Sequence, residues 1–272
     1  MGYQLGLIGA GIDASRTPIM HEKEAQAQGI NLTYKILNTD TADASLDELI
    51  SWGRKLGFDG FNITHPFKQE VIGLLDEIDE AAEKIGAVNT VKFDASGKAT
   101  GYNTDYFGYK SGLESLQGSD LSTVVQLGAG GAGSAVAQAL KDSGVSDLRI
   151  FDLSAERAQA VAEQVGGTVI QPTELEASVA AASGVVNCTP IGMASHPGTP
   201  IDVALLRPEM WISDVIYFPL ETEFLKAARE RGCETLDGSL MAVGQAAQAF
   251  EIFTGEPADS ARMREIFASV NA

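Results

Sequence analysis

The sequence lacks several features that would assign it to a specialised class of protein. Its two cysteines, Cys188 and Cys233, lie far apart and form no CxxC or Cys/His spacing. A disulfide framework and a zinc site are therefore not indicated, and no metal is expected. No apolar run approaches the roughly 18 residues that a membrane-spanning helix needs. The N-terminus begins like a buried strand rather than a secretory signal, so we expect a cytoplasmic protein that binds no membrane.

Basic residues are also scarce. Lysine and arginine number 19 against 37 aspartates and glutamates, which gives a formal net charge of −18. No basic cluster stands out from this acidic background, so nucleic acid is not expected as a partner. The same charge would repel a small anionic substrate at long range, and any anion site must therefore be built from local hydrogen-bond donors.

The rest of the composition is that of an ordinary globular protein. Hydrophobic residues make up 44% and charged residues 21%, and 272 residues are more typical of two domains than of one. Apolar runs that read as strands alternate in the first half with helix-like segments, which indicates a mixed or parallel sheet. The strands are expected at 3–9, 32–37, 58–63, 87–93 and 98–103, and the helices at 18–28 and 45–56.

The second half of the chain continues this alternation. Residues 121–154 contain strand, glycine-rich turn, helix and strand, as one parallel crossover unit requires. Further strands are predicted at 184–189 and 211–217, and helices at 154–165, 173–182, 221–231 and 239–255. The pattern indicates a doubly wound parallel sheet in a second domain.

A glycine-rich loop lies between the first strand and helix of that crossover unit. Gly128, Gly130 and Gly133 fit the pattern G-x-G-x-x-G. In a dinucleotide-binding fold the first glycine permits a tight turn, the second lets the backbone approach a pyrophosphate, and the third allows close helix–strand packing. The helix N-terminus then supplies N–H groups to the phosphates. The same loop includes Ala129, Gly131 and Ala132. A tight turn without a ligand is the alternative.

A carboxylate follows the loop at the end of the next predicted strand. Asp152 lies 19 residues beyond Gly133. At that position a carboxylate can accept hydrogen bonds from an adenosine ribose and would repel a 2′-phosphate, which favours NAD over NADP. A helix cap is the alternative role for Asp152. Arg157, five residues on, is expected either to stack on the adenine or to point to solvent.

Two segments of the first half place polar groups where an anion could bind. Thr17 is predicted to cap a helix with Pro18 at its first position, so that the hydroxyls of Ser15 and Thr17 surround a positive helix end. Simple capping is the alternative for this pair. In "NITHPFKQE", Pro66 marks a predicted helix start, and Lys68 would stand in its first turn, where the helix dipole disfavours a cation. Taken alone, Lys68 would be a solvated surface residue.

These groups belong to a longer series of motifs that runs from Ser15-x-Thr17 through "NITHPFK", "GAVNT", "NTD", "GAGGAG" and "NCTPIGM" to "DGSLMAVGQAAQAF". The series covers nearly the whole chain in order and resembles the shikimate/quinate dehydrogenase family. The resemblance implies an α/β fold with two domains. An N-terminal substrate-binding and catalytic domain over 1–105 is completed by C-terminal helices over 240–272. A Rossmann doubly wound parallel-sheet domain for the nicotinamide cofactor occupies 106–239.

The resemblance also implies roles for individual residues. Lys68 and Asp105 match the catalytic pair, which takes the hydroxyl proton as hydride leaves for the nicotinamide, and which of the two is the formal base stays open. The pair that grips the substrate carboxylate is matched by Ser15 and Thr17. Ligands of the ring hydroxyls are matched by Thr64, Asn89 and Gln245. Residues beside the cofactor are matched by Thr189, Pro190, Gly238 and Met241, although Met241 could equally be core packing.

The expected reaction is reversible, NAD-dependent oxidation of quinate, shikimate or both to the 3-dehydro acid. Thr17 stands where many members of the family have serine, and its extra methyl group keeps quinate open alongside shikimate. Residues 152–154, "DLS", replace the basic stretch of NADP-dependent members. The alternatives are a related hydroxy acid such as aminoshikimate, a methylenetetrahydrofolate dehydrogenase, and a non-catalytic NAD or metabolite sensor. The oligomeric state is open, with a homodimer as one option.

Overall fold

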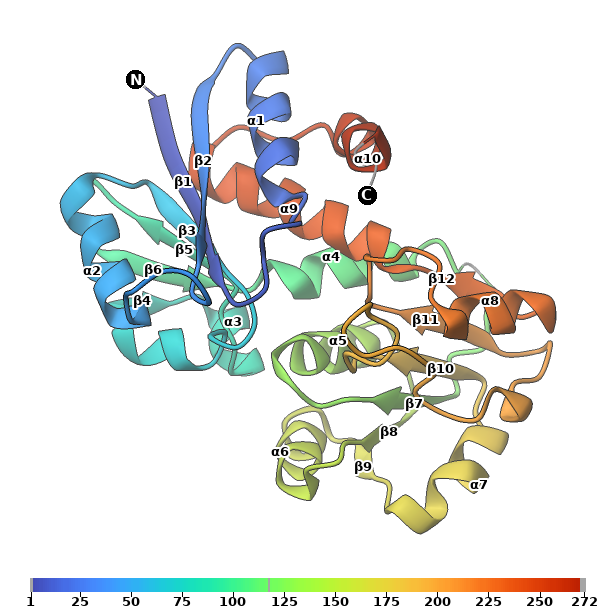
Figure 1. Ribbon diagram of the computed structural model, residues 1–272. Coiled ribbons are helices and arrows are strands. Elements are labelled where there is room, and N and C mark those ends of the chain that lie inside the picture. Colours follow the sequence, from blue (N-terminus) through green and yellow to red (C-terminus); the bar gives the residue numbers. More distant parts are fainter. Residues whose placement is uncertain (1, 117, 270–272) are drawn as a thin grey trace. The chain divides into compact units, whose positions relative to one another are not determined.

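A computed structural model describes residues 2–116 and 118–269 and divides the chain into two compact units. The first unit comprises Met1–Thr104 and Val243–Ala272, and the second comprises Asp105–Ala242. Each unit is built around one six-stranded sheet (Figure 1). Among the described residues, no helix has the length and hydropathy of a membrane span, and no cluster of His, Cys, Asp and Glu could hold a metal ion.

The sheet of the first unit is mixed. Its strand order is β2-β1-β3-β5-β6-β4. Strand β1 pairs in parallel with β2 and β3, whereas β3 pairs antiparallel with β5, and β5 forms an antiparallel hairpin with β6. The strand bounds are Gly2–Gly9 (β1), Asn31–Asn38 (β2), Gly60–Ile63 (β3), Glu77–Ile78 (β4), Thr90–Phe93 (β5) and Ala99–Tyr102 (β6). The expectation of a mixed or parallel sheet is confirmed.

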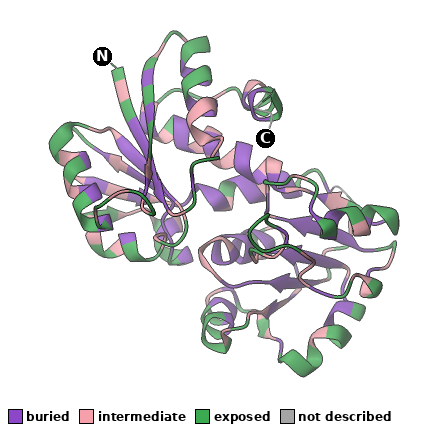
Figure 2. Cartoon of the chain, viewed as in Figure 1, coloured by how far each residue is buried: buried purple, intermediate pink, exposed green. Residues whose placement is uncertain are grey.

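The helices of the first unit are α1 (Thr17–Ala27), α2 (Leu46–Leu56), α3 (Glu80–Ile85) and α10 (Ser260–Ser269), and the chain also enters this unit through α9 (Gly238–Thr254). Helix α2 begins with a capping box, in which Ser45 accepts from the Glu48 N–H and the Glu48 carboxylate accepts from the Ser45 N–H. Its inner face packs on the sheet around the buried ring of Phe61, and Figure 2 shows the buried residues concentrated along the strands.

One predicted helix start in this unit is wrong. Residues 64–68 form a turn in which the Phe67 N–H donates to the Thr64 carbonyl, and only a short 3-10 helix, Glu70–Leu74, follows. The Lys68 carbonyl accepts from the Val88 N–H at 2.7 Å. It is therefore bonded to another segment of the chain and not within a helix. Lys68 therefore does not stand in the first turn of an α-helix.

The sheet of the second unit is wholly parallel, with the order β12-β11-β10-β7-β8-β9. Its strands are Thr123–Leu127 (β7), Asp147–Phe151 (β8), Thr168–Val169 (β9), Gly184–Asn187 (β10), Trp211–Asp214 (β11) and Glu234–Leu236 (β12). Its helices are Thr104–Leu113 (α4), Gly131–Asp142 (α5), Ala155–Val165 (α6), Leu175–Ala180 (α7) and Glu223–Glu230 (α8). This is the doubly wound arrangement expected from the sequence.

Alternating residues of β7 show how both faces of this sheet are covered. Val124 belongs to one apolar cluster with residues of α4, α5 and α6. Val125 and Leu127 belong to another cluster with residues of α7 and α8. Because successive side chains of a strand point to opposite faces, the two clusters lie on opposite sides of the sheet. Burial on both faces explains why the strands of this unit read as continuous apolar runs.

A buried histidine lies in the core of the first unit. His21 of α1 is fully buried, and neither of its ring nitrogens has a hydrogen-bond partner. Its ring centroid lies 5.1 Å from that of Tyr34 and 6.0 Å from that of Phe250. Burial lowers the pKa of His21 from 6.5 to about 3. The folded protein therefore keeps the imidazole neutral well below the pH at which the unfolded chain takes up a proton.

Replacing His21 by leucine should weaken the dependence of stability on pH. The contribution of His21 is present above pH 6.5 and is lost as the pH falls from 6.5 towards about 3. Between pH 7 and pH 5, the free energy of unfolding of the wild type should therefore fall by about 2 kcal/mol more than that of His21→Leu. Urea unfolding at the two pH values measures the difference. Equal losses in both proteins would mean that the folded state protonates His21.

Candidate active site

The glycine loop joins β7 to α5, and its three glycines meet different demands. Gly128 has a φ of +97°, and a Cβ on Gly133 would lie 2.4 Å from the Gly128 carbonyl oxygen. Gly130 stands at the N-cap of α5 without a side-chain cap, and a Cβ there would meet nothing within 4 Å. Gly128 and Gly133 are therefore required by the fold of the loop itself. Gly130 leaves open space at a helix N-terminus, where a phosphate can approach.

Gln126 holds this loop in place, a role that the sequence analysis did not predict. It is fully buried in β7, and its Nε2 donates to the carbonyls of Gly128 and Gly133, both at 2.9 Å. One side chain thus ties the start of the loop to the first turn of α5. A polar residue in an apolar strand was the only signal that could have revealed it.

Asp152 follows β8 and is tied to the same loop. Its Oδ2 accepts from the Ala129 N–H at 2.8 Å, and its Oδ1 accepts from the Ser154 N–H at 2.8 Å and from Arg157 Nη2 at 2.9 Å. Burial alone would raise the pKa of Asp152, but these hydrogen bonds outweigh burial and hold the pKa below its usual value. The carboxylate is therefore charged at neutral pH.

These contacts exclude one alternative, a helix cap at Asp152. The N-cap of α6 is Ser154, whose side chain accepts from the Arg157 N–H, so Asp152 does not cap the helix. The Arg157 guanidinium pairs with Asp152 instead of simply pointing to solvent, although more than half of its side chain is exposed.

A second polar network fixes the ends of β10 and β11. Asn187 Oδ1 accepts from the N–H and the hydroxyl of Thr189, and Asn187 Nδ2 donates to the Ile191 carbonyl and to Asp214 Oδ1. Asp214 is buried, accepts from the Thr222 hydroxyl at 2.8 Å, and has a pKa raised to about 6 by burial. The network sets the backbone path through Thr189 and Pro190. No sequence motif indicated the part played by Asp214.

Packing accounts for two further predicted cofactor residues. Gly238 opens α9, where a Cβ would lie 2.5 Å from the carbonyl oxygens of Val215 and Ile216. Met241 is buried in the same apolar cluster as Leu236. Both positions are thus explained without a ligand, which agrees with the core-packing alternative for Met241.

In the first unit, Ser15 and Thr17 come together at the start of α1. Their hydroxyl oxygens lie 3.2 Å apart, and the Thr17 N–H donates to Ser15 Oγ at 3.3 Å. The prediction that Thr17 caps the helix is wrong, because Arg16 occupies the N-cap position and makes no side-chain capping bond. Thr17 already has helical geometry, so its hydroxyl lies beside the first turn, next to that of Ser15.

Thr64 and Lys68 lie in the turn that follows β3. The Thr64 N–H donates to the Ile8 carbonyl at 3.0 Å, which fixes Thr64 beside the carboxyl end of β1. Both side chains are half-buried. The Lys68 backbone is tied to Val88, next to Asn89 in the chain. Hydrogen bonds of the sheet therefore hold the main chain of this turn in place.

Asn89 and Gln245 meet although they are far apart in the chain. Asn89 Nδ2 donates to Gln245 Oε1 at 3.3 Å. Asn89 Oδ1 accepts from the Thr104 N–H at 2.8 Å and from the hydroxyls of Thr104 and Thr90. The side-chain oxygen of Asn89 is thus already hydrogen-bonded within the protein. Its amide group and the half-buried Gln245 are the parts of this pair suited to a polar ligand.

Asp105 stands in the first turn of α4, where a carboxylate is favoured by the helix dipole, and its side chain is buried. It opens the second unit, whereas Lys68 belongs to the first. The first unit collects hydroxyl, amide and ammonium groups, which suit a small polyhydroxy acid. The second unit supplies a glycine loop with a charged acceptor, which suits a dinucleotide.

Known proteins are similar to this chain along nearly its whole length. Three family models match: the shikimate dehydrogenase substrate binding domain over residues 7–91, shikimate/quinate 5-dehydrogenase over 112–193, and the shikimate 5′-dehydrogenase C-terminal domain over 238–266. The chain is 50% identical to a quinate/shikimate dehydrogenase (NAD(+)) of Corynebacterium glutamicum, over 98% of both chains. It is 47% identical to a shikimate dehydrogenase (NADP(+)) of Pseudarthrobacter chlorophenolicus, over 99% of this chain and 96% of the relative.

A solved structure is similar as well. The structure of quinate dehydrogenase from Corynebacterium glutamicum in complex with NAD superposes with a TM-score of 0.93 and 49% identity, over 99% of both chains.

Two alanine substitutions separate the structural glycine from the open one. Gly133→Ala should lower the free energy of unfolding by about 1–3 kcal/mol, because the new Cβ would overlap the Gly128 carbonyl. Gly130→Ala should change it by less than about 0.5 kcal/mol, since the position is open and its φ is −80°. Chemical denaturation of both variants measures this contrast. Equal stability of the two would contradict the loop packing described above.

Proposed function

The chain belongs to the shikimate/quinate dehydrogenase family, and we propose from this premise that it oxidises quinate or shikimate to the 3-dehydro acid with NAD. The observation that carries the cofactor choice is the Asp152 carboxylate, charged and bonded to the glycine loop at the end of β8. Overall identity does not decide it, because a relative named for NAD and another named for NADP are 50% and 47% identical to this chain.

The residues of the second unit fit the proposed cofactor. The uncapped N-terminus of α5 and the open space at Gly130 would receive the pyrophosphate. Asp152 would accept hydrogen bonds from the adenosine ribose and repel a 2′-phosphate. When bound, NAD supplies the hydride acceptor. Thr189 and Pro190, fixed by the Asn187 network, are proposed to line its nicotinamide end, with Gly238 and Met241 as supporting residues.

The residues of the first unit are proposed to hold the substrate. The hydroxyls of Ser15 and Thr17 would donate to the carboxylate, with the positive end of α1 behind them. Thr64, Asn89 and Gln245 would bond to the ring hydroxyls. In a chain with a net charge of −18, such local donors are what allows an anionic acid to bind.

Lys68 and Asp105 are proposed as the acid–base pair. Oxidation of a secondary alcohol requires that the hydroxyl proton be removed as hydride leaves the carbon, and a lysine amine can take that proton. Asp105 would orient the ammonium group and the hydroxyl. The proton is assigned to the pair rather than to one residue.

Lys68→Ala tests the catalytic assignment. We expect kcat to fall by about 10²- to 10⁴-fold, because the proton acceptor is lost, whereas the dissociation constant of NAD should stay within about twofold. Lys55→Ala, which removes an exposed lysine of α2, is the matched control and should keep wild-type kinetics. Steady-state rates and NAD titration measure the two effects. Wild-type turnover in Lys68→Ala would end the assignment.

Asp152→Asn tests the cofactor assignment. The asparagine keeps an oxygen for the Ala129 N–H but removes the charge, so NADP should be repelled less. We expect the ratio of kcat/KM for NAD over NADP to fall by about tenfold or more. Ratios measured with one substrate at fixed ionic strength decide it. An unchanged ratio would place the discrimination elsewhere.

A further inference from the structure

Helix α10 is bonded to both ends of α1. At its C-terminal end, Arg16 Nη1 donates to the Phe267 carbonyl at 3.0 Å, and the guanidinium carbon lies 4.6 Å from the centroid of the Phe267 ring. Phe267 stands near the C-terminal end of α10, where the helix dipole favours a cation. Arg16 itself lies between Ser15 and Thr17 and is the N-cap residue of α1.

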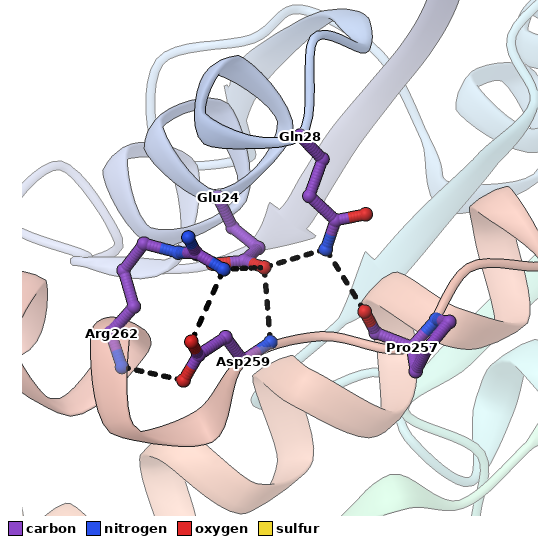
Figure 3. A network of polar contacts seen from close by, with 5 residues as sticks. All are labelled: Glu24, Gln28, Pro257, Asp259 and Arg262. Atoms are coloured by element: carbon purple, nitrogen blue, oxygen red, sulfur yellow. Dashed lines mark hydrogen bonds and ion pairs between the residues drawn. The ribbon is translucent and has the colours of Figure 1, made fainter.

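The other end of α10 is held by the carboxylate of Glu24, a buried residue, and Figure 3 shows its contacts. Glu24 of α1 accepts from the Asp259 N–H at 3.0 Å, immediately before α10 begins, and from Arg262 Nε at 2.7 Å. Gln28 donates both to Glu24 and to the Pro257 carbonyl. Burial alone would raise the pKa of Glu24, but the hydrogen bonds outweigh it and the pKa is lowered. A negative charge at a helix N-terminus is favourable, so both contacts follow the dipole of α10.

A cation is disfavoured at a helix N-terminus, so Arg16 is an unexpected N-cap for α1. The Arg16 guanidinium instead donates to the Phe267 carbonyl near the C-terminal end of α10, which explains an arginine at this position. We propose that α10 clamps α1 at both ends, and that Arg16 is a positioning residue that holds Ser15 and Thr17 in the geometry that binds the substrate carboxylate. This inference rests on the proposed function, because it takes Ser15 and Thr17 to be the carboxylate ligands.

Kinetics of four variants test the clamp in the full-length protein. Arg16→Ala should raise KM for quinate and shikimate by about tenfold, because a displaced ligand pair binds poorly, and should leave kcat and the KM of NAD within about twofold. Arg16→Lys keeps a donor for the Phe267 carbonyl and should recover much of the affinity. The matched control is Arg264→Ala, which removes an exposed arginine from the same helix and should behave as wild type.

Phe267→Leu distinguishes positioning from direct contact. It leaves the Arg16 guanidinium in place but removes the ring against which it lies. Under the clamp, KM for the acid rises in Phe267→Leu in the same direction as in Arg16→Ala. A raised KM in Arg16→Ala without faster exchange of the peptides that cover residues 15–21 would mean that Arg16 binds substrate directly and would overturn the clamp.

Amide hydrogen exchange gives a readout that needs no turnover. In Arg16→Ala and Phe267→Leu, peptides covering residues 15–21 should exchange faster than in the wild type, and in Arg262→Gln the acceleration should reach residues 22–28. Unchanged exchange in all three variants overturns the clamp. Absence of turnover by the wild type with either acid would instead refute the proposed function, so the two failures are distinguishable.

Discussion

Anionic groups can be held by this chain only through local hydrogen-bond donors, because a net charge of −18 repels them at long range. The structure supplies such donors at two helix N-termini. Helices α1 and α5 both begin at a residue whose side chain makes no capping bond, Arg16 and Gly130. At α5 the dipole and the N–H groups are then offered to a ligand. At α1 the Thr17 N–H already donates to Ser15 Oγ and Pro18 has no N–H, so the donors there are the hydroxyls of Ser15 and Thr17. The proposed carboxylate and pyrophosphate positions therefore lie at the N-termini of α1 and α5.

Helix ends left open in this way must be held by something else. For α5 the holding group is Gln126, which bonds to the loop carbonyls at Gly128 and Gly133. For α1 it is α10, through Arg16 and Glu24. Buried polar side chains that are fully bonded can fix one conformation of a loop or helix, whereas unbonded ones are costly. Not every buried polar atom in the described part of the chain is bonded, because the ring nitrogens of His21 in α1 and Oε1 of Gln126 itself have no partner.

The sequence predicted the family, the fold class and the main strands and helices, and the comparisons and the structure confirm them. Strands β4 and β9, with two residues each, are too short to show any periodicity and were not predicted. Strand β12 and helices α3 and α4 were not predicted either. The helix start at Pro66 and the cap at Thr17 were wrong because local propensity gave way to bonds made elsewhere, by the Lys68 carbonyl and by Arg16. Asp214 gained its role through its bond to Asn187 of the neighbouring strand, which no local pattern records. The individual site roles stay predictions.

The most direct test of the account is the initial rate of NAD and NADP reduction by the purified protein with quinate and with shikimate, in all four combinations. The account predicts that at least one of the two acids reduces NAD, with kcat/KM at least about tenfold above that for NADP, because Asp152 stays charged beside the proposed ribose position. Preference for NADP would contradict the role of Asp152. Binding of NAD without turnover of either acid would contradict the proposed reaction.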